Sequence, residues 1–131
     1  MISDKGLLFI EPVHLSSSTP IVDHLTRRMA AAFRMARADD GHFYLGWHRC
    51  ICGANSTNQN YYLPNGFLTN SLCVHYVAYH RSEIPAHQLT LIKTLTSGEV
   101  EPTYLELVGK RFQEDRSYLS KIYYLISQVF K

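Results

Sequence analysis

All three cysteines of this 131-residue chain, and three of its seven histidines, lie between His48 and Arg81. Thiolate and imidazole groups are the ligands that zinc prefers in proteins. A metal ion bound by them would tie the two ends of this stretch together, so this clustering constrains the fold more strongly than any other feature of the sequence. The candidate ligands form two groups, one at each end of the stretch.

The first group lies at the end of a predicted strand over residues 41–52, where large apolar residues alternate with other types. Successive side chains of a strand point to opposite faces, so the apolar ones take the core and His48, Cys50 and Cys52 share the other face. Cysteines two residues apart on a strand lie about 7 Å apart at Cα. Gly53 allows the slight bend that would bring both sulfurs to one ion. A regular strand could supply His48 with Cys50, or Cys50 with Cys52, but not all three.

The second group lies in a helix expected over about residues 71–81, capped by Thr69-Asn70-Ser71. In a formed helix Cys73 and His75 lie about 200° apart around the axis. Both can therefore reach one ion only if Cys73 lies in an uncoiled first turn. Cys73 and His80 share a face of the helix, but about 10 Å of rise separates them.

The pattern predicts a closed zinc site of the structural kind, in which four protein ligands surround the ion and binding adds folding energy. The predicted ligands are Cys50, Cys52, Cys73 and His75, with His48 and His80 as substitute ligands or as groups that contact the ligands. An alternative stays open, in which the three cysteines are buried thiols that behave as small hydrophobic residues.

The composition predicts one folded domain over residues 1–131, since 46% of the residues are hydrophobic and 12% are aromatic. A domain of this size buries about two-thirds of its unfolded surface, so a metal would add to its stability without being required for folding. No apolar run approaches the roughly 20 residues that span a membrane. The short apolar run 7–10 is followed by Glu11 and Pro12, unlike a signal peptide. An odd number of cysteines without an export signal predicts a cytoplasmic protein.

The first helix is expected to start at the hydroxyl-rich residues 16–19, with Pro20 at the first helical position, and to end near residue 38. Its apolar stripe contains Ile21, Leu25, Met29, Ala32, Phe33 and Ala36. Its outer face carries a row of arginines: Arg27, Arg34 and Arg37. This row could bind phosphates or an acidic protein surface, or it could be a solvated face whose arginine stems cover the core edge. The formal net charge of +2 and the lack of aromatic residues within the row argue against nucleic acid.

Three further helices are expected after the central stretch. One starts near residues 82–85 and stops at Gly98, and the next starts at a capping box of Thr103 and Glu106 and runs toward Phe112. The last covers about residues 115–131, and its tyrosines could support a homo-oligomer contact. A small antiparallel sheet is expected around residues 42–51 and 61–68, with a hairpin turn at Asn65-Gly66. The predicted fold is α+β, a single compact and predominantly helical domain.

Three functions fit these features, and the first is the predicted one. It is a non-catalytic intracellular protein-interaction module, whose zinc site makes the 48–81 region rigid. The residues predicted to bind the partner protein are Arg27, Arg34, Arg37, Tyr61 and Tyr62, beside the polar loop 55–60. The second function is a metal-dependent hydrolase with an open zinc position, although residues 42–81 contain no Asp or Glu to act as general base. In the third, Cys73 or Cys50 is a nucleophile with a nearby histidine as base.

Overall fold

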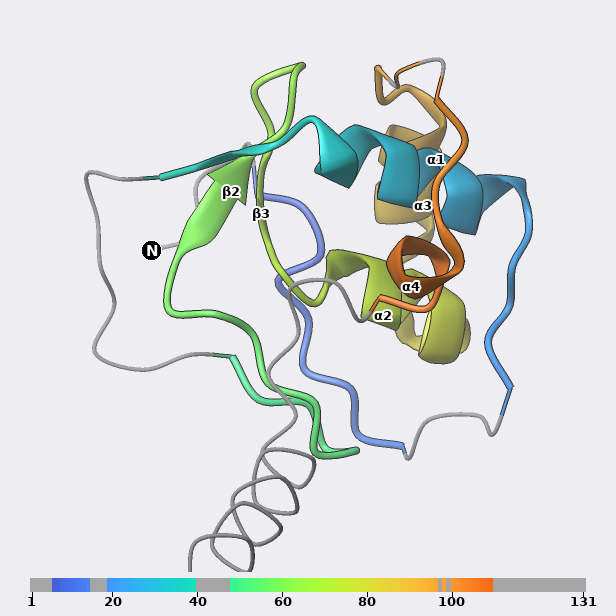
Figure 1. Ribbon diagram of the computed structural model, residues 1–131. Helices are drawn as coiled ribbons and strands as arrows, with labels where there is room; N and C mark the ends of the chain where they lie inside the picture. Colours follow the sequence, from blue (N-terminus) through green and yellow to red (C-terminus); the bar gives the residue numbers. More distant parts are fainter. Residues whose placement is uncertain (1–5, 15–18, 40–47, 97, 99, 110–131) are drawn as a thin grey trace, which may run out of the picture.

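Helix α1, His24–Arg34, contacts the three other described α-helices, α2 (Cys73–Tyr79), α3 (Ala86–Lys93) and α4 (Tyr104–Leu107) (Figure 1). The computed structural model describes residues 6–14, 19–39, 48–96, 98 and 100–109. Within these ranges, four α-helices and a three-stranded antiparallel sheet form a compact α+β arrangement with a modest helical fraction. This confirms the predicted fold class. None of the described helices has the length and apolar character needed to cross a membrane.

Helix α1 begins later than the sequence predicts. Pro20 precedes the helix, and Asp23 caps it by accepting hydrogen bonds from two backbone N–H groups of the first turn, at 3.1 and 3.2 Å. Ile21 donates its backbone N–H to the carbonyl of Ala78 in α2 at 2.8 Å. Arg81 holds the Asp23 carboxylate with two hydrogen bonds of 2.8 and 2.7 Å. Contacts with a distant part of the chain therefore determine where this helix starts.

The core lies between α1 and the elements around it. Most of the predicted apolar stripe of α1 is buried, whereas Ile21 is 42% exposed because it precedes the helix. The core cluster joins side chains of α1 to those of the N-terminal segment, α2, α3 and α4, among them Leu7, Leu8, Met29, Phe33, Tyr76, Val77, Ile92 and Leu107. The N-terminal segment enters this core beside β3, where the Leu7 N–H donates to the Leu68 carbonyl at 2.8 Å.

Strands β1 (Arg37–Ala38), β2 (Asn60–Tyr62) and β3 (Leu68–Asn70) pair in the order β1-β2-β3. The hairpin between β2 and β3 turns at Asn65-Gly66 as predicted, with Gly66 at a φ of 91°. The strand predicted over 42–51 is not a member of this sheet in the part of the chain described. Residues 48–56 instead form a separate tight hairpin, and residues 42–47 lie outside the described ranges.

The last two described helices are shorter than predicted. Helix α3 follows a 3₁₀ turn at Arg81–Glu83 and ends at Lys93. Helix α4 starts with the predicted capping box: the Glu106 N–H donates to Thr103 Oγ1 at 3.3 Å, and the Thr103 N–H donates to the Glu106 carboxylate at 3.1 Å. It ends at Leu107. The predicted C-terminal helix, with its homo-oligomer contact, lies outside the described residues.

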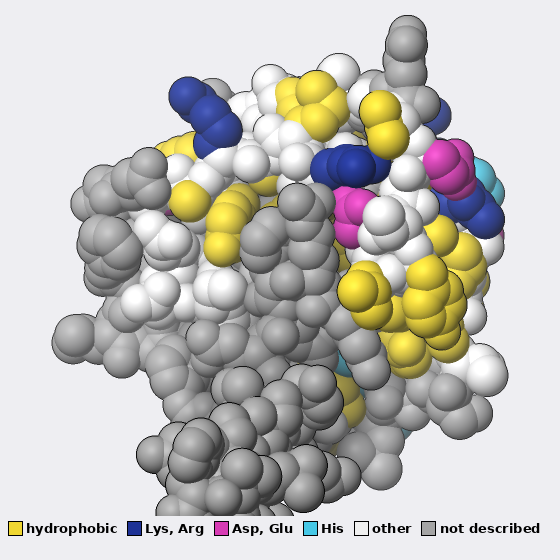
Figure 2. Space-filling model, in the orientation of Figure 1, with side chains coloured by type: hydrophobic (Ala, Val, Ile, Leu, Met, Phe, Trp, Pro, Cys, Tyr) yellow, Lys and Arg dark blue, Asp and Glu magenta, His cyan; other side chains and the backbone are white. Residues whose placement is uncertain are grey.

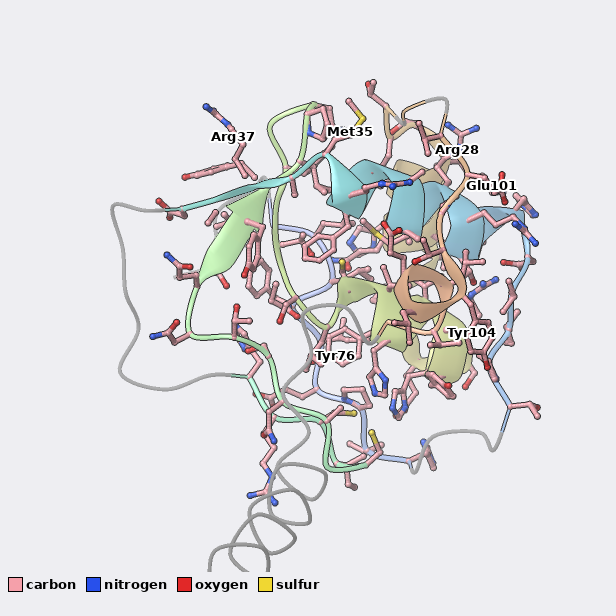
Figure 3. All side chains as sticks on the ribbon, viewed as in Figure 1. Arg28, Met35, Arg37, Tyr76, Glu101 and Tyr104 are labelled. Carbon is pink, nitrogen blue, oxygen red and sulfur yellow. The ribbon has the colours of Figure 1, made fainter. Side chains whose placement is uncertain are left out.

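Two of the three arginines predicted to bind a partner have partners within the molecule. Arg27 forms an ion pair with Glu101, and Arg34 lies 3.7 Å from the Glu106 carboxylate and donates to the Glu101 carbonyl at 3.3 Å. On the face shown in Figure 2, basic and acidic side chains lie next to each other. Arg37, at the edge strand β1, is exposed and points away from the body of the molecule (Figure 3). Its binding to a partner stays a prediction.

The polar loop predicted as a recognition surface is partly turned inward. Asn55, Ser56 and Asn60 are buried, and the Thr57 N–H donates to the hydroxyl of Ser71 at 2.9 Å. Tyr61 is half-buried, with its ring 5.2 Å from that of Phe33 and its hydroxyl 3.0 Å from Thr57 Oγ1. Tyr62 remains 40% exposed. Much of this loop therefore supports the fold. Tyr62 and the three arginines of the predicted partner surface are exposed, and Arg27 and Arg34 also contact acidic groups of the molecule itself.

Candidate metal centre

Cys50 and Cys52 lie in a tight hairpin turn. The Cys50 N–H donates to the Ala54 carbonyl at 2.8 Å, and the Gly53 N–H donates to the Cys50 carbonyl at 2.9 Å. Gly53 has a φ of 97°, a conformation that residues with a side chain rarely adopt. The turn is sharper than the bend that the sequence predicts, and it brings the two sulfurs within 4.8 Å of each other.

His75 and His80 are positioned by α2 and by the way that helix ends. His75 lies inside the helix, whereas His80 is its C-cap, with φ −128° and ψ 33°. Residues five positions apart in a continuous helix would lie about 140° apart around the axis. The change of backbone direction at His80 brings the two imidazole rings together, with centroids 5.1 Å apart. Asn70 fixes the start of α2, because its side chain accepts from the Leu72 N–H at 2.8 Å and donates to the Leu8 carbonyl at 3.0 Å.

The four side chains of Cys50, Cys52, His75 and His80 meet at one place. The Sγ of Cys52 lies 3.1 Å from Nε2 of His75, and the Sγ of Cys50 lies 3.1 Å from Nε2 of His80. All four ligand atoms lie within 4.8 Å of one another. Around a zinc ion with bonds of about 2.3 Å to sulfur and about 2.0 Å to nitrogen, tetrahedral ligand atoms lie roughly 3.3–3.8 Å apart. This cluster could therefore hold a metal ion after small side-chain movements.

Solvent has little access to the cluster. Cys50 and His80 are each 2% exposed and His75 is 5% exposed, while Cys52 is half-buried. Burial raises the pKa of the Cys50 thiol to about 11 and outweighs a hydrogen bond from the backbone N–H of Cys52, which lowers this pKa. Burial lowers the pKa of His80 and outweighs the negative charge of Glu83, which raises this pKa. His80 is thus a neutral imidazole at pH 7, the form that binds metal ions.

Glu83 connects this cluster to the N-terminal segment. One carboxylate oxygen lies 3.5 Å from Nδ1 of His80, the ring nitrogen on the far side from the cluster. The other accepts from the Val13 N–H at 2.8 Å and lies 3.1 Å from Nδ1 of His14. A carboxylate at the second ring nitrogen of a metal-binding histidine fixes its tautomer and orientation. Glu83 is placed to do this for His80.

Cys73, a ligand in the set predicted from the sequence, lies outside the cluster. It is the first residue of α2, already in helical conformation, so its side chain points about 200° away from that of His75. It is fully buried in the hydrophobic core, where burial raises the pKa of its thiol to about 12. His80, expected as a substitute ligand, occupies the fourth position instead.

His48, the other expected substitute, is also outside the cluster. It lies at the base of the hairpin, with its ring 5.4 Å from that of Phe9. The fourth ligand could have been found from the sequence, because the gap of four residues between His75 and His80 is typical of zinc-binding histidine pairs. The contact of Glu83 with His80 has no such signal, since it depends on the 3₁₀ turn that follows α2.

Comparison of the chain with protein-family models, with curated protein sequences and with solved structures finds no match. Any functional conclusion therefore depends on the geometry and chemistry of the cluster itself.

Proposed function

We propose that this protein is a non-catalytic protein-interaction module whose fold contains a structural zinc site formed by Cys50, Cys52, His75 and His80. The observation that carries this proposal is the convergence of two sulfur and two imidazole nitrogen atoms within 4.8 Å of one another. Two cysteines and two histidines are a common ligand set of structural zinc sites. Oxygen ligands, which calcium and magnesium prefer, are absent from this set.

The geometry favours a structural over a catalytic metal. Four protein ligands fill a tetrahedral site, whereas a catalytic zinc keeps one position open for water. The Glu83 carboxylate is directed at His80, so it does not face an open position as a general base would. Cys73 and Cys50 are also poor candidates for a nucleophile, because their thiol pKa values are raised by burial, to about 12 and about 11.

A zinc ion at this place would join the hairpin turn to helix α2. Its ligands come from both ends of the 48–81 stretch, so binding would fix the hairpin against the body of the protein. The surface next to the hairpin would then be rigid before any partner binds, which lowers the entropy cost of association. The three free thiols fit a reducing compartment, where such a site is stable.

X-ray absorption spectroscopy of protein purified without a metal-affinity tag tests this assignment. We expect about one zinc per chain, with two sulfur and two nitrogen neighbours. Iodoacetamide should alkylate Cys52 only after a chelator has removed the zinc, while the fully buried Cys73 serves as an internal control that stays unmodified in both states. Protein without bound metal, or a zinc with three sulfur neighbours, would contradict the proposed site.

A further inference from the structure

A cleft of about 550 Å³ lies beside the metal centre, between the N-terminal segment and the hairpin that carries Cys50. Its lining comes from three parts of the chain: Ile10, Glu11 and Pro12; His48, Arg49, Cys50 and Ile51; and Tyr76 of α2. The first two groups form its walls, which come into contact at the rings of Phe9 and His48. A volume of this size is sufficient for a small ligand or a few residues of a peptide.

The Tyr76 side chain contributes a buried hydroxyl to the cleft. Tyr76 is 1% exposed, and no hydrogen bond of its hydroxyl is found among the residues that the structure describes. Figure 3 shows this side chain on the side of α2 toward the N-terminal segment. Buried hydroxyls in folded proteins nearly always have a hydrogen-bond partner, and leaving one without a partner costs stability. A hydroxyl of this kind at a cleft indicates that a bound group completes the site.

Both walls of the cleft also carry backbone groups that are not used within the described part of the chain. Arg49 faces Asn55 across the hairpin, and the residue pairs on either side of them hold the hydrogen bonds. In a pair of this kind the N–H and C=O of Arg49 point away from the strand of Asn55. On the opposite wall, the backbone groups of Ile10 and Glu11 make no hydrogen bond with another described residue. Each wall of the cleft thus offers backbone groups, at Arg49 and at Ile10 and Glu11, that have no hydrogen bond to another described residue.

Glu11 and Arg49 place opposite charges on the two walls. Both side chains are exposed, and neither forms an ion pair with another described residue. Surface charges of this kind contribute little to folding stability. At the rim of a cleft they select ligands by complementary charge.

We propose that this cleft binds a short extended peptide segment of a partner protein, which lies between the two walls as an added strand. Backbone hydrogen bonds to both edges would supply affinity. An acidic residue of the peptide would face Arg49 and a basic residue would face Glu11. Tyr76 would donate its hydroxyl proton to a peptide carbonyl. The inference rests on the proposed function, because the zinc would hold the wall that contains Cys50.

A blocked pentapeptide, Ac-Thr-Glu-Val-Lys-Thr-NH2, tests the proposal directly. Its charged residues are two positions apart, so their side chains lie on the same face of an extended chain. The peptide is titrated into ¹⁵N-labelled full-length protein whose zinc content has been measured on the same sample. We expect amide shift changes at Ile10, Glu11, Arg49 and Ile51. An N-methylated peptide with the same side chains lacks the backbone donors and should not bind.

Variants of the cleft separate peptide binding from folding. Arg49→Gln and Glu11→Gln should each weaken binding about tenfold, the equivalent of one lost charge contact. Lys93→Gln, which removes an exposed cation from α3, should leave binding unchanged. Tyr76→Phe should weaken peptide binding while leaving the stability of the free protein unchanged or raised, because the hydroxyl has no hydrogen bond within the described part of the chain. A purely structural tyrosine would show the opposite pattern.

The outcomes distinguish this inference from the zinc assignment. Zinc-loaded protein that shows no shifts with millimolar peptide, or that binds the N-methylated peptide equally well, overturns the peptide site and leaves the zinc site intact. Binding that is insensitive to both Arg49→Gln and Glu11→Gln also overturns it. If the protein purifies without zinc and still binds the peptide, the result would support the cleft and refute the proposed metal site.

Discussion

Glu83 is a single residue on which both the metal centre and the N-terminal segment depend. Its carboxylate contacts Nδ1 of His80 and accepts from the backbone of Val13. The Val13 N–H is the main cause of the lowered pKa of Glu83, so the carboxylate stays ionised at neutral pH. An ionised group at this position favours the His80 tautomer with the proton on Nδ1, which leaves Nε2 free to bind metal.

We therefore expect Glu83→Gln to lower zinc affinity by about 10–100-fold, the usual effect of removing such a carboxylate. Competition with a fluorescent zinc chelator measures the change. Ser82→Ala, at the neighbouring exposed position, is the matched control and should bind zinc as the wild type does. Equal affinities of Glu83→Gln and wild type would show that the carboxylate does not orient His80.

Gly109 is the second residue with a specific effect on the site, because the chain after α4 passes directly over His75. A Cβ atom added at Gly109 would lie 2.5 Å from the backbone nitrogen of His75, and the φ of Gly109 is 72°. At Gly66 the φ is similarly positive, at 91°, but nothing lies within 4 Å of the added atom. A comparison of substitutions at the two glycines thus distinguishes backbone strain alone from strain combined with a steric clash against α2.

Gly66→Ala should cost about 1 kcal/mol of unfolding free energy, from its backbone conformation alone. Gly109→Ala should cost roughly 3 kcal/mol, because the clash with α2 adds an overpacking term, and it should also weaken zinc binding. Chemical denaturation and zinc titration of both variants measure these effects. Similar costs for the two variants would mean that the contact between Gly109 and His75 is not tight.

At the scale of elements, the start of α1 depends on the charge of Asp23. Arg81 is the main cause of a pKa of Asp23 far below its usual range. Because the pKa is lowered in the folded state, this stabilisation is complete above the unfolded pKa of about 3.9 and is lost as the pH falls below it. Arg81 also lies just beyond the C-cap of α2, so the same pair links α1 to the end of the helix that carries His75.

Two substitutions separate the cap from the charge pair. Asp23→Asn keeps a good N-cap and loses the charge, so its destabilisation relative to wild type should be full at pH 7 and should shrink steadily as the pH falls below about 3.9, toward the lowered pKa of Asp23 in the folded state. Asp23→Ala should lose about 1 kcal/mol more at pH 7, because the cap is also removed. Urea denaturation at a series of pH values measures both. A difference between Asp23→Asn and wild type that does not depend on pH would contradict the role of the ion pair.

Local signals predicted some elements well and long-range contacts determined the others. The capping box of Thr103 and Glu106 and the turn at Asn65-Gly66 are complete within a few residues, and both are present as predicted. The predicted start of α1 was wrong, because the helix begins at an Asp23 N-cap whose carboxylate is held by Arg81, far along the chain. The ligand type and region of the metal centre followed from composition. The spacing of His75 and His80 is a signal for His80 as the fourth ligand, whereas the exclusion of Cys73 depends on α2 being helical from its first residue.

At the scale of the whole molecule, the metal centre lies at the edge of a core that is formed by other residues. Side chains from the N-terminal segment and the four described helices pack in one hydrophobic cluster. Of the four proposed metal ligands in the described part of the chain, Cys50 belongs to this cluster and Cys52 packs against it. The fold should therefore survive without zinc, although the hairpin would lose its attachment to α2.

Removal of zinc by a chelator should lower the thermal midpoint while leaving the helical circular dichroism signal at 25 °C nearly unchanged. The loss of stability follows from mass action, and amounts to about 4 kcal/mol when free zinc is a thousandfold above its dissociation constant. Circular dichroism before and after chelation, and after zinc is restored, checks both parts. Complete loss of the helical signal would mean that the metal is required for folding.

Native mass spectrometry of two single variants tests the four-ligand assignment most directly. Cys73→Ala should keep one zinc per chain, because Cys73 lies in the core away from the cluster. His80→Ala should lose the zinc under the same conditions, because its Nε2 is one of the four converging atoms. Loss of zinc by Cys73→Ala together with its retention by His80→Ala would contradict the metal centre described for this protein.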